Sequence, residues 1–104
     1  MSGIPRVEAE VTFLAAEEGG RRHLPTAWGS YMPHLTIGDG ELLGVRFVAG
    51  PTPSPGVRAL FVLELMYHPT VCYENLLPGV RFDVREGGRV VGHGSVSSAL
   101  SHDV

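Results

Sequence analysis

Alternating apolar and polar positions are the main pattern along the chain, and they predict strands. Over Arg6–Leu14 every second side chain is apolar from Val7 to Phe13, and the side chains between them are polar. A period of two places one set of side chains on a buried face and the other in water. The same alternation over Val80–Arg85 predicts a second strand.

Four further segments complete the strand prediction. The apolar run Val57–Met66 lies between prolines, which is typical of a short buried strand. Shorter candidates are His34–Ile37, Leu42–Val48 and Arg89–Val96. The polar tail, Ser97–Val104, is expected to fray.

Turn signals separate these segments. Glu17–Arg22 contains two adjacent glycines, which allow the positive φ angles of a tight turn. Gly50–Gly56 carries three prolines at alternate positions, and these cannot donate to a sheet ladder, so an exposed loop is expected. Glu86-Gly87-Gly88 joins the last two strands and is typical of a hairpin turn.

Six short strands without an amphipathic helix predict an all-β fold, either a sandwich or a barrel. Closure into a barrel would hide the edge strands that otherwise invite aggregation. The length of 104 residues predicts one domain over residues 1–104, with flexible ends at 1–5 and 101–104. An apolar fraction of 43% is typical of a globular protein.

Charge and composition narrow the function classes. The formal net charge of −3 argues against a generic binder of nucleic acids or membrane surfaces, which carries a basic excess. All eight basic side chains are arginines, so catalysis by a lysine is excluded. The single cysteine, Cys72, excludes an intramolecular disulfide. No signal peptide or membrane span is evident, so a cytoplasmic location is expected.

The motifs of common enzymes are missing. The five histidines lack metal-ligand spacing, so no metal site is expected. Ser30 is not in a nucleophile elbow, and Cys72 has no local signature of a nucleophile. The Gly92-x-Gly94 segment precedes no helix that could bind a nucleotide phosphate. We therefore expect a protein without cofactor that is not an enzyme.

Arginines beside double-glycine turns carry the clearest chemical signal. Arg21-Arg22-His23 follows one such turn, and Arg85 and Arg89 flank the other. The planar guanidinium binds phosphate or carboxylate with two parallel hydrogen bonds, and exposed loops suit that role. The alternative is a set of local ion pairs with Glu17, Glu18 and Glu86, which would leave a solvated turn.

Several segments, in order along residues 6–100, resemble the third, C-terminal domain of bacterial elongation factor Tu. These are Val7-Glu8-Ala9-Glu10-Val11, Glu17-Glu18-Gly19-Gly20-Arg21, Tyr31-x-Pro33, His68-Pro69 and Arg81–Gly94. The last is the most specific. The resemblance implies a six-stranded antiparallel β-barrel with a face that touches the T-stem of aminoacyl-tRNA. It also implies contacts with the GTPase domain and the nucleotide-exchange factor of that family.

Three family motifs that face tRNA map onto this chain with changes. The G-G-R-H motif becomes Gly19-Gly20-Arg21-Arg22, with His23 displaced by one position, and Y-R-P-Q becomes Tyr31-Met32-Pro33-His34. The E-G-G turn is intact as Glu86-Gly87-Gly88. The stretch Leu35–Glu41 is acidic where the family is aromatic and basic. The GTPase domain of the family is not in this chain, so no GTP site is expected.

These observations lead to three hypotheses. The first is a binding module that engages RNA of the tRNA type or a translation-related protein. Its contact residues would be Arg21, Arg22, His23, His34, Arg85, Glu86, Gly87 and Gly88. The second is a mimic or decoy of elongation factor Tu that binds the partners of that factor, and it predicts an exposed apolar patch containing Trp28 and Tyr31. The third is a small-molecule site in a barrel mouth lined by His34, His68 and Cys72.

Overall fold

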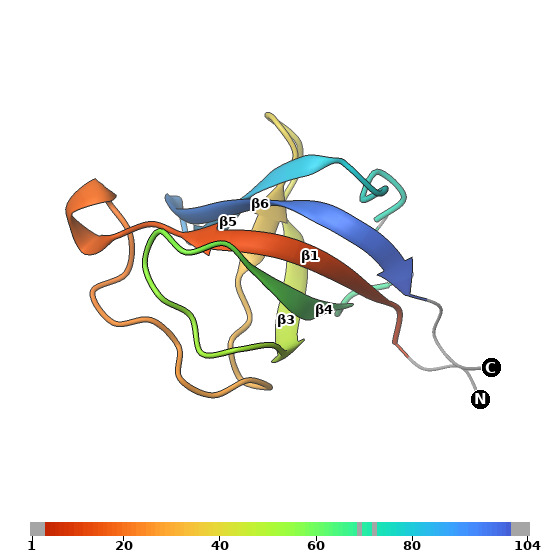
Figure 1. The fold of residues 1–104 in the computed structure, drawn as a ribbon. Helices are drawn as coiled ribbons and strands as arrows, with labels where there is room; N and C mark the ends of the chain where they lie inside the picture. Colours follow the sequence, from red (N-terminus) through yellow and green to blue (C-terminus); the bar gives the residue numbers. More distant parts are fainter. Residues whose placement is uncertain (1–3, 69, 72, 101–104) are drawn as a thin grey trace.

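The chain folds into a closed barrel of six antiparallel strands, which confirms the predicted fold class (Figure 1). The computed structural model describes residues 4–68, 70–71 and 73–100, without the side chains of 99 and 100. The strands are β1 (Arg6–Phe13), β2 (His34–Thr36), β3 (Leu43–Ala49), β4 (Ala59–Leu65), β5 (Arg81–Glu86) and β6 (Arg89–Leu100). Around the barrel they follow the order β1-β4-β3-β2-β5-β6, so β1 and β6 close it.

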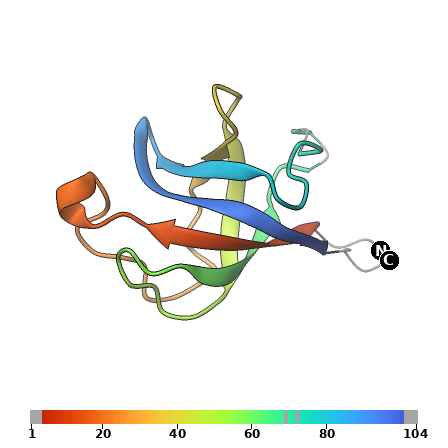
Figure 2. The ribbon, with the colours of Figure 1, turned by 45° about the horizontal axis from the view of Figure 1, so that its top comes forward.

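Strand β1 lies between β4 and β6 along its length, as Figures 1 and 2 both show. Val11 is paired with Ala59 of β4 on one side and with Gly94 of β6 on the other. The apolar side chains of β1 are buried, while its polar ones point outward. The alternation read from the sequence therefore corresponds to the inside and outside of the barrel.

Aromatic rings fill the interior. Phe13, Phe47 and Phe61 are almost completely buried, and each comes from a different strand. The rings of Phe47 and Phe61 meet edge to face with centroids 5.5 Å apart, and Phe13 meets Phe61 in the same way at 6.1 Å. This geometry suits aromatic quadrupoles and adds to the free energy of burial. The barrel interior is thus a packed core.

Two glycines of β6 allow its backbone to pack closely against β1. A Cβ atom added at Gly94 would lie 2.1 Å from the carbonyl oxygen of Glu10, and one at Gly92 would lie 2.9 Å from that of Thr12. A side chain at either position would force the two backbones apart. The Gly92-x-Gly94 pattern therefore serves strand packing.

The strand ends differ from the sequence prediction mainly in β6. The tail Ser97–Val104 was expected to fray, but β6 continues through Leu100 along the start of β1, so the expectation is wrong for its first four residues. A register shift beside Ser97 accommodates the break in alternation, and the Ser98 hydroxyl donates a hydrogen bond to Glu8 (3.0 Å). Strand β4 begins two residues later than predicted, because the Val57 amide closes a turn onto Ser54.

The flexible ends expected at 1–5 and 101–104 fall mostly outside the described residues. At the N-terminal end, the Pro5 carbonyl accepts a hydrogen bond from the Leu65 amide (2.9 Å). The only helix among the described residues is η1 (Ala16–Glu18), a single 3-10 turn. No helix in that part of the chain is long and apolar enough to cross a membrane.

The outer face of the barrel holds one nearly buried carboxylate. Glu64 of β4 is only 5% exposed, and it accepts hydrogen bonds from Arg6 of β1 and Arg46 of β3. Burial alone would raise the pKa of Glu64, but the hydrogen bonds from Arg46 and Arg6 outweigh it and lower that pKa below its ordinary value. The triad thus links three neighbouring strands through side chains.

Replacing Gly94 by alanine should destabilise the barrel, because its new Cβ meets a backbone oxygen that cannot rotate away. We expect a loss of about 1–3 kcal/mol in the free energy of unfolding, or failure to fold. Gly88→Ala is the control, since a Cβ there meets no atom within 4 Å. Urea unfolding measures the free energy of unfolding of both variants. Equal stabilities would contradict the close approach of β6 to β1 at Gly94.

Glu64→Gln should cost about 1–3 kcal/mol near pH 7, because a charge-assisted pair of hydrogen bonds is lost. The pKa of Glu64 is lowered on folding, so its charged form contributes stability above the ordinary value of 4.5. That contribution disappears as the pH falls through the lowered pKa.

Urea unfolding of both proteins at pH 7 and near pH 3 measures this effect. The difference between wild type and Glu64→Gln should shrink at the lower pH. Glu74→Gln, at an exposed position, provides the control and should change little at either pH. A difference that stays constant with pH would contradict the assigned role of the Glu64 charge.

Candidate functional site

Three segments meet at one end of the barrel, and we call this region the loop end. They are residues 14–33, the proline loop 50–56, and the β5–β6 turn at 86–88. In Figure 1 the first two lie side by side below η1, where the chain leaves β1. The predicted double-glycine turns thus come together, although they are more than 60 residues apart in the sequence.

The first turn owes its shape to the Glu-Glu-Gly-Gly sequence. The Glu18 carboxylate accepts a hydrogen bond from the Ala15 amide (3.0 Å), and the Gly20 amide donates to the Ala15 carbonyl (3.0 Å). Gly19 has φ of +97°, a conformation that favours glycine. The chain is thereby reversed and delivers Arg21 toward the β5–β6 turn.

Glu86 connects the two turns. Its Oε2 atom accepts a hydrogen bond from Arg21 Nη1 (2.8 Å) and another from the Tyr31 hydroxyl (2.6 Å). The Arg21 guanidinium also lies over the Tyr31 ring, 5.3 Å from its centroid, which is a cation–π contact. Arg21, Tyr31 and Glu86, which we call the Glu86 cluster, therefore form one connected unit.

The electrostatics of the Glu86 cluster favour fixed structure. Burial, and then the hydrogen bond to Glu86, raise the pKa of Tyr31 far above its ordinary value. Tyr31 therefore keeps its proton and remains a donor at any physiological pH. Since Glu86 Oε2 receives two donors, this carboxylate acts as an anchor for the loop.

The proline loop has its own attachment. Trp28 Nε1 donates a hydrogen bond to the Gly50 carbonyl (2.9 Å), and the Trp28 ring stacks on Phe47 at a centroid distance of 5.4 Å. Gly50 has φ of +146°, and a Cβ at this position would lie 2.3 Å from the Phe61 ring. The loop can pass over the aromatic core only because residue 50 has no side chain.

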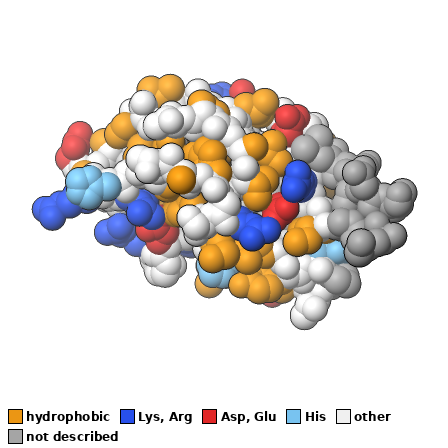
Figure 3. All heavy atoms as spheres, turned by 90° about the horizontal axis from the view of Figure 1, so that it is seen from below, with side chains coloured by type: hydrophobic (Ala, Val, Ile, Leu, Met, Phe, Trp, Pro, Cys, Tyr) orange, Lys and Arg blue, Asp and Glu red, His pale blue; other side chains and the backbone are white. Residues whose placement is uncertain are grey.

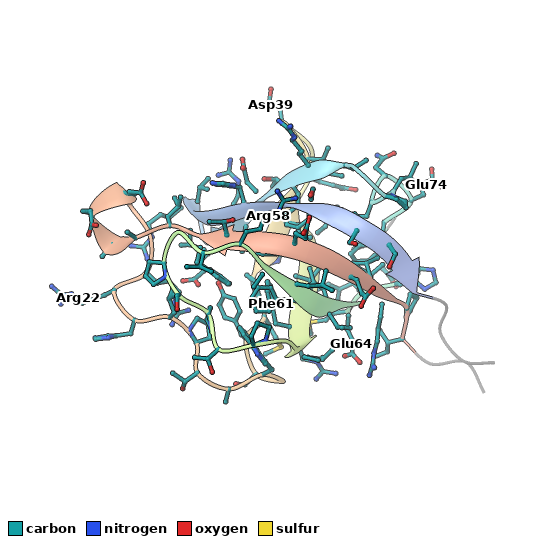
Figure 4. The ribbon with its side chains drawn as sticks, viewed as in Figure 1. Arg22, Asp39, Arg58, Phe61, Glu64 and Glu74 are labelled. Atoms are coloured by element: carbon teal, nitrogen blue, oxygen red, sulfur yellow. The ribbon has the colours of Figure 1, made fainter. Side chains whose placement is uncertain are left out.

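An open hollow of about 570 Å³, which we call the loop groove, lies between these two loops. Its polar and charged lining includes Glu17, Arg21, Arg22, His23, Thr26 and Thr52, and its proline lining includes Pro25, Pro53 and Pro55. Arg22 and His23 are exposed to solvent. Figure 4 shows Arg22 reaching away from the barrel at the loop end, and Figure 3 shows basic and histidine side chains gathered there.

Six of the eight predicted contact residues therefore lie at the loop end. Arg21 is fixed by Glu86, while Arg22 and His23 face the loop groove. Gly87 and Gly88 form the exposed tip of the β5–β6 turn, where Gly87 has φ of +63°. Arg21 does form an ion pair with Glu86, but this pair joins the two turns across 65 residues and is therefore not the local pairing of the alternative.

The other two predicted residues lie elsewhere. His34 of β2 and Arg85 of β5 are directly paired across neighbouring strands, on the outer side of the sheet. Arg85 Nε donates to the Thr36 hydroxyl (2.9 Å), and Arg85 Nη1 makes a longer contact with the Gly88 carbonyl (3.4 Å). These two residues therefore belong to the outer face next to the loop end.

The structure also locates the residues named for the exposed apolar patch and for the small-molecule site. Tyr31 is 8% exposed and Trp28 is half-buried, so the expected exposed patch is not built from these two rings. Cys72 lies outside the described residues. His34 is on the outer side of the sheet, and His68 is exposed.

Sequence reasoning missed two contributors to the site. The anchoring role of Tyr31 was not anticipated, although its place in the Tyr-x-Pro motif singled it out. The proline loop was expected only to be exposed, yet Pro53 and Pro55 line the loop groove. Their contribution depends on the Trp28–Gly50 hydrogen bond, for which the sequence carries no signal.

Among the described residues no group of three or more His, Cys, Asp or Glu side chains is placed to hold a metal ion. No protein-family model matches the chain. The resemblance to the C-terminal domain of elongation factor Tu therefore rests on the sequence motifs alone.

Tyr31→Phe and Glu86→Ala should each destabilise the protein by about 1–3 kcal/mol, because the first removes one donor to Glu86 and the second leaves the Tyr31 hydroxyl and Arg21 without their acceptor. In the double variant the losses should not add, and we expect a coupling of about 1–2 kcal/mol. Urea unfolding of the four proteins gives this value. Simple additivity would show that the hydrogen bond does not stabilise the loop end.

Proposed function

We propose that the protein is a non-catalytic binding module that engages RNA of the tRNA type through the loop groove. The observation that carries this proposal is the placement of Arg21, Arg22 and His23 along one open groove. Phosphate contacts from arginine, hydroxyl and imidazole groups position most nucleic-acid complexes. Thr26 and Thr52 supply two hydroxyls in the same groove.

Arg21 and Arg22 have different environments, and this difference supports a preformed site. Arg21 is held by Glu86 and by the Tyr31 ring, so it orients the segment that follows. Arg22 has no ion pair among the described residues and is exposed, so its guanidinium can bind a phosphate without first breaking another contact. Binding to an already ordered loop loses little conformational entropy.

The charge of the groove sets the expected affinity. Two arginines face it together with one carboxylate, Glu17, and the Arg21 charge is offset by Glu86. Nucleic-acid affinity grows with the number of phosphates neutralised. With one or two phosphate contacts, we expect a dissociation constant in the micromolar range at low salt, and a strong dependence on ionic strength.

A titration of bulk tRNA by fluorescence anisotropy tests the proposal, using wild type and the Arg22→Ala/His23→Ala variant. For about two phosphate contacts, raising NaCl from about 50 to 200 mM should weaken wild-type binding roughly tenfold. The variant should bind more weakly, and its salt slope should fall by about one. Both replaced side chains are exposed, so the fold should be retained.

Arg81→Ala is the matched control for this titration. Arg81 is also an exposed arginine, but it lies at the opposite end of β5 from the turn and lines other hollows. Its loss should leave the affinity nearly unchanged. The proposal is overturned if tRNA does not bind at low salt, or if the Arg81 variant loses as much affinity as the groove variant.

A further inference from the structure

A second exposed surface lies on the outer face of β2 and β3, away from the loop groove. Three large apolar side chains reach solvent there: Met32 is 53% exposed, Leu42 49% and Tyr67 50%. They come from the segment before β2, the residue just before β3 and the segment after β4. We call this surface the Tyr67 patch.

The sheet register brings these side chains together. Gly44 of β3 is paired with His34 of β2, and the Phe47 amide donates to the Tyr31 carbonyl, which places Met32 beside Arg46 on the same face. A Cβ at Gly44 would lie 2.3 Å from Cε2 of Tyr67. The Tyr67 ring therefore lies directly on the Gly44 backbone, and Leu42 precedes Gly44 by two residues in the chain.

The Tyr67 backbone is held in place by a chain of two hydrogen bonds. Its amide donates to the Tyr73 hydroxyl (3.1 Å), which in turn donates to the Gly44 carbonyl (2.6 Å). Tyr73 is 5% exposed, so this link is shielded from water. A half-exposed aromatic ring that rests on a sheet backbone is the kind of group that carries binding energy in protein interfaces, because an aromatic side chain has few rotatable bonds and loses little entropy when it is covered.

The charges beside the patch favour an acidic partner. Arg46 and Arg6 share one carboxylate, Glu64, so that triad has an excess positive charge. On the other side, Arg85 is paired with His34 across the strands and donates its Nε–H to the neutral Thr36. On the face seen in Figure 3, two basic side chains lie on either side of an acidic one, with apolar side chains beside them.

Three carboxylates limit where a partner's negative charge can lie. Glu41 precedes Leu42 at the β2–β3 hairpin, and Asp83 is paired with Thr36. Figure 4 places Asp39 at the tip of the same hairpin. Negative groups of a partner are therefore favoured toward Arg46 and Arg85, and disfavoured toward the hairpin tip.

We propose that the Tyr67 patch docks a short apolar peptide segment of a partner protein that carries one or two carboxylates. The apolar side chains cover Met32, Leu42 and the Tyr67 ring, and the carboxylates face Arg46 and Arg85. This surface does not depend on the loop groove, so its partner and RNA can be tested separately.

Selection from an unbiased library of 12-residue peptides displayed on phage tests this proposal, with the intact protein as bait. We expect the selected peptides to be rich in apolar residues and in Asp or Glu, and poor in Lys and Arg. Binding of a synthetic copy, measured by calorimetry, should weaken as NaCl is raised from about 50 to 500 mM, because exposed charge pairs are screened.

Variants then locate the bound peptide. Met32→Ser and Tyr67→Ala should each weaken binding at least tenfold. Leu77→Ser removes a similarly exposed apolar side chain elsewhere (58% exposed) and should change binding less than twofold. Met32 is a surface residue, so its variant remains informative even if Tyr67→Ala loosens the following segment; circular dichroism checks both folds.

Several results would overturn the proposal. These are failure to select any peptide, selection of basic peptides, or binding that survives both Met32→Ser and Tyr67→Ala. Loss of tRNA binding on Met32→Ser would assign the face to RNA instead. Conversely, Arg22→Ala/His23→Ala should leave peptide binding intact, so failure of the RNA proposal and failure of this one are distinguishable.

Discussion

The close pairing of β1 with β6 is the constraint on which the rest of the structure depends. It joins the two ends of the strand order and so gives every strand two neighbours. The approach requires Gly92 and Gly94, since a Cβ at either would meet the β1 backbone. Closure satisfies the edge hydrogen bonds of the sheet and encloses the phenylalanine core in one step. The loops and the two proposed binding surfaces are attached to this frame.

Side-chain hydrogen bonds fix the loops to the barrel. Glu86 stands at the end of β5 and holds both Arg21 and Tyr31, which belong to a long irregular segment. Trp28 provides a second attachment by joining this segment to the proline loop at Gly50. A loop of this length would otherwise sample many conformations. The two anchors thus present Arg22 and His23 in a defined place.

Glycines allow aromatic rings to serve two opposite purposes in this barrel. At Gly50 the absent side chain leaves room for Phe61, which is completely enclosed in the core. At Gly44 it leaves room for Tyr67 on the outside, where half of the ring stays exposed. The first arrangement stabilises the fold by burying apolar area. The second keeps an ordered apolar group in water, as expected for a surface that another molecule covers.

The sequence by itself determined the approximate positions of the strands and the all-β class, because a period of two and glycine or proline turns are local signals. These signals left a sandwich and a barrel open, and the barrel was implied only by the resemblance. The sequence also indicated which turns carry arginines. It did not reveal that β6 runs to Leu100, since those polar residues are strand only through pairing with β1. Nor did it reveal the hydrogen-bond partners of Glu86 and Glu64, or the contact of the Tyr67 ring with Gly44. Those contacts join residues far apart in the chain, and only barrel closure brings them within reach.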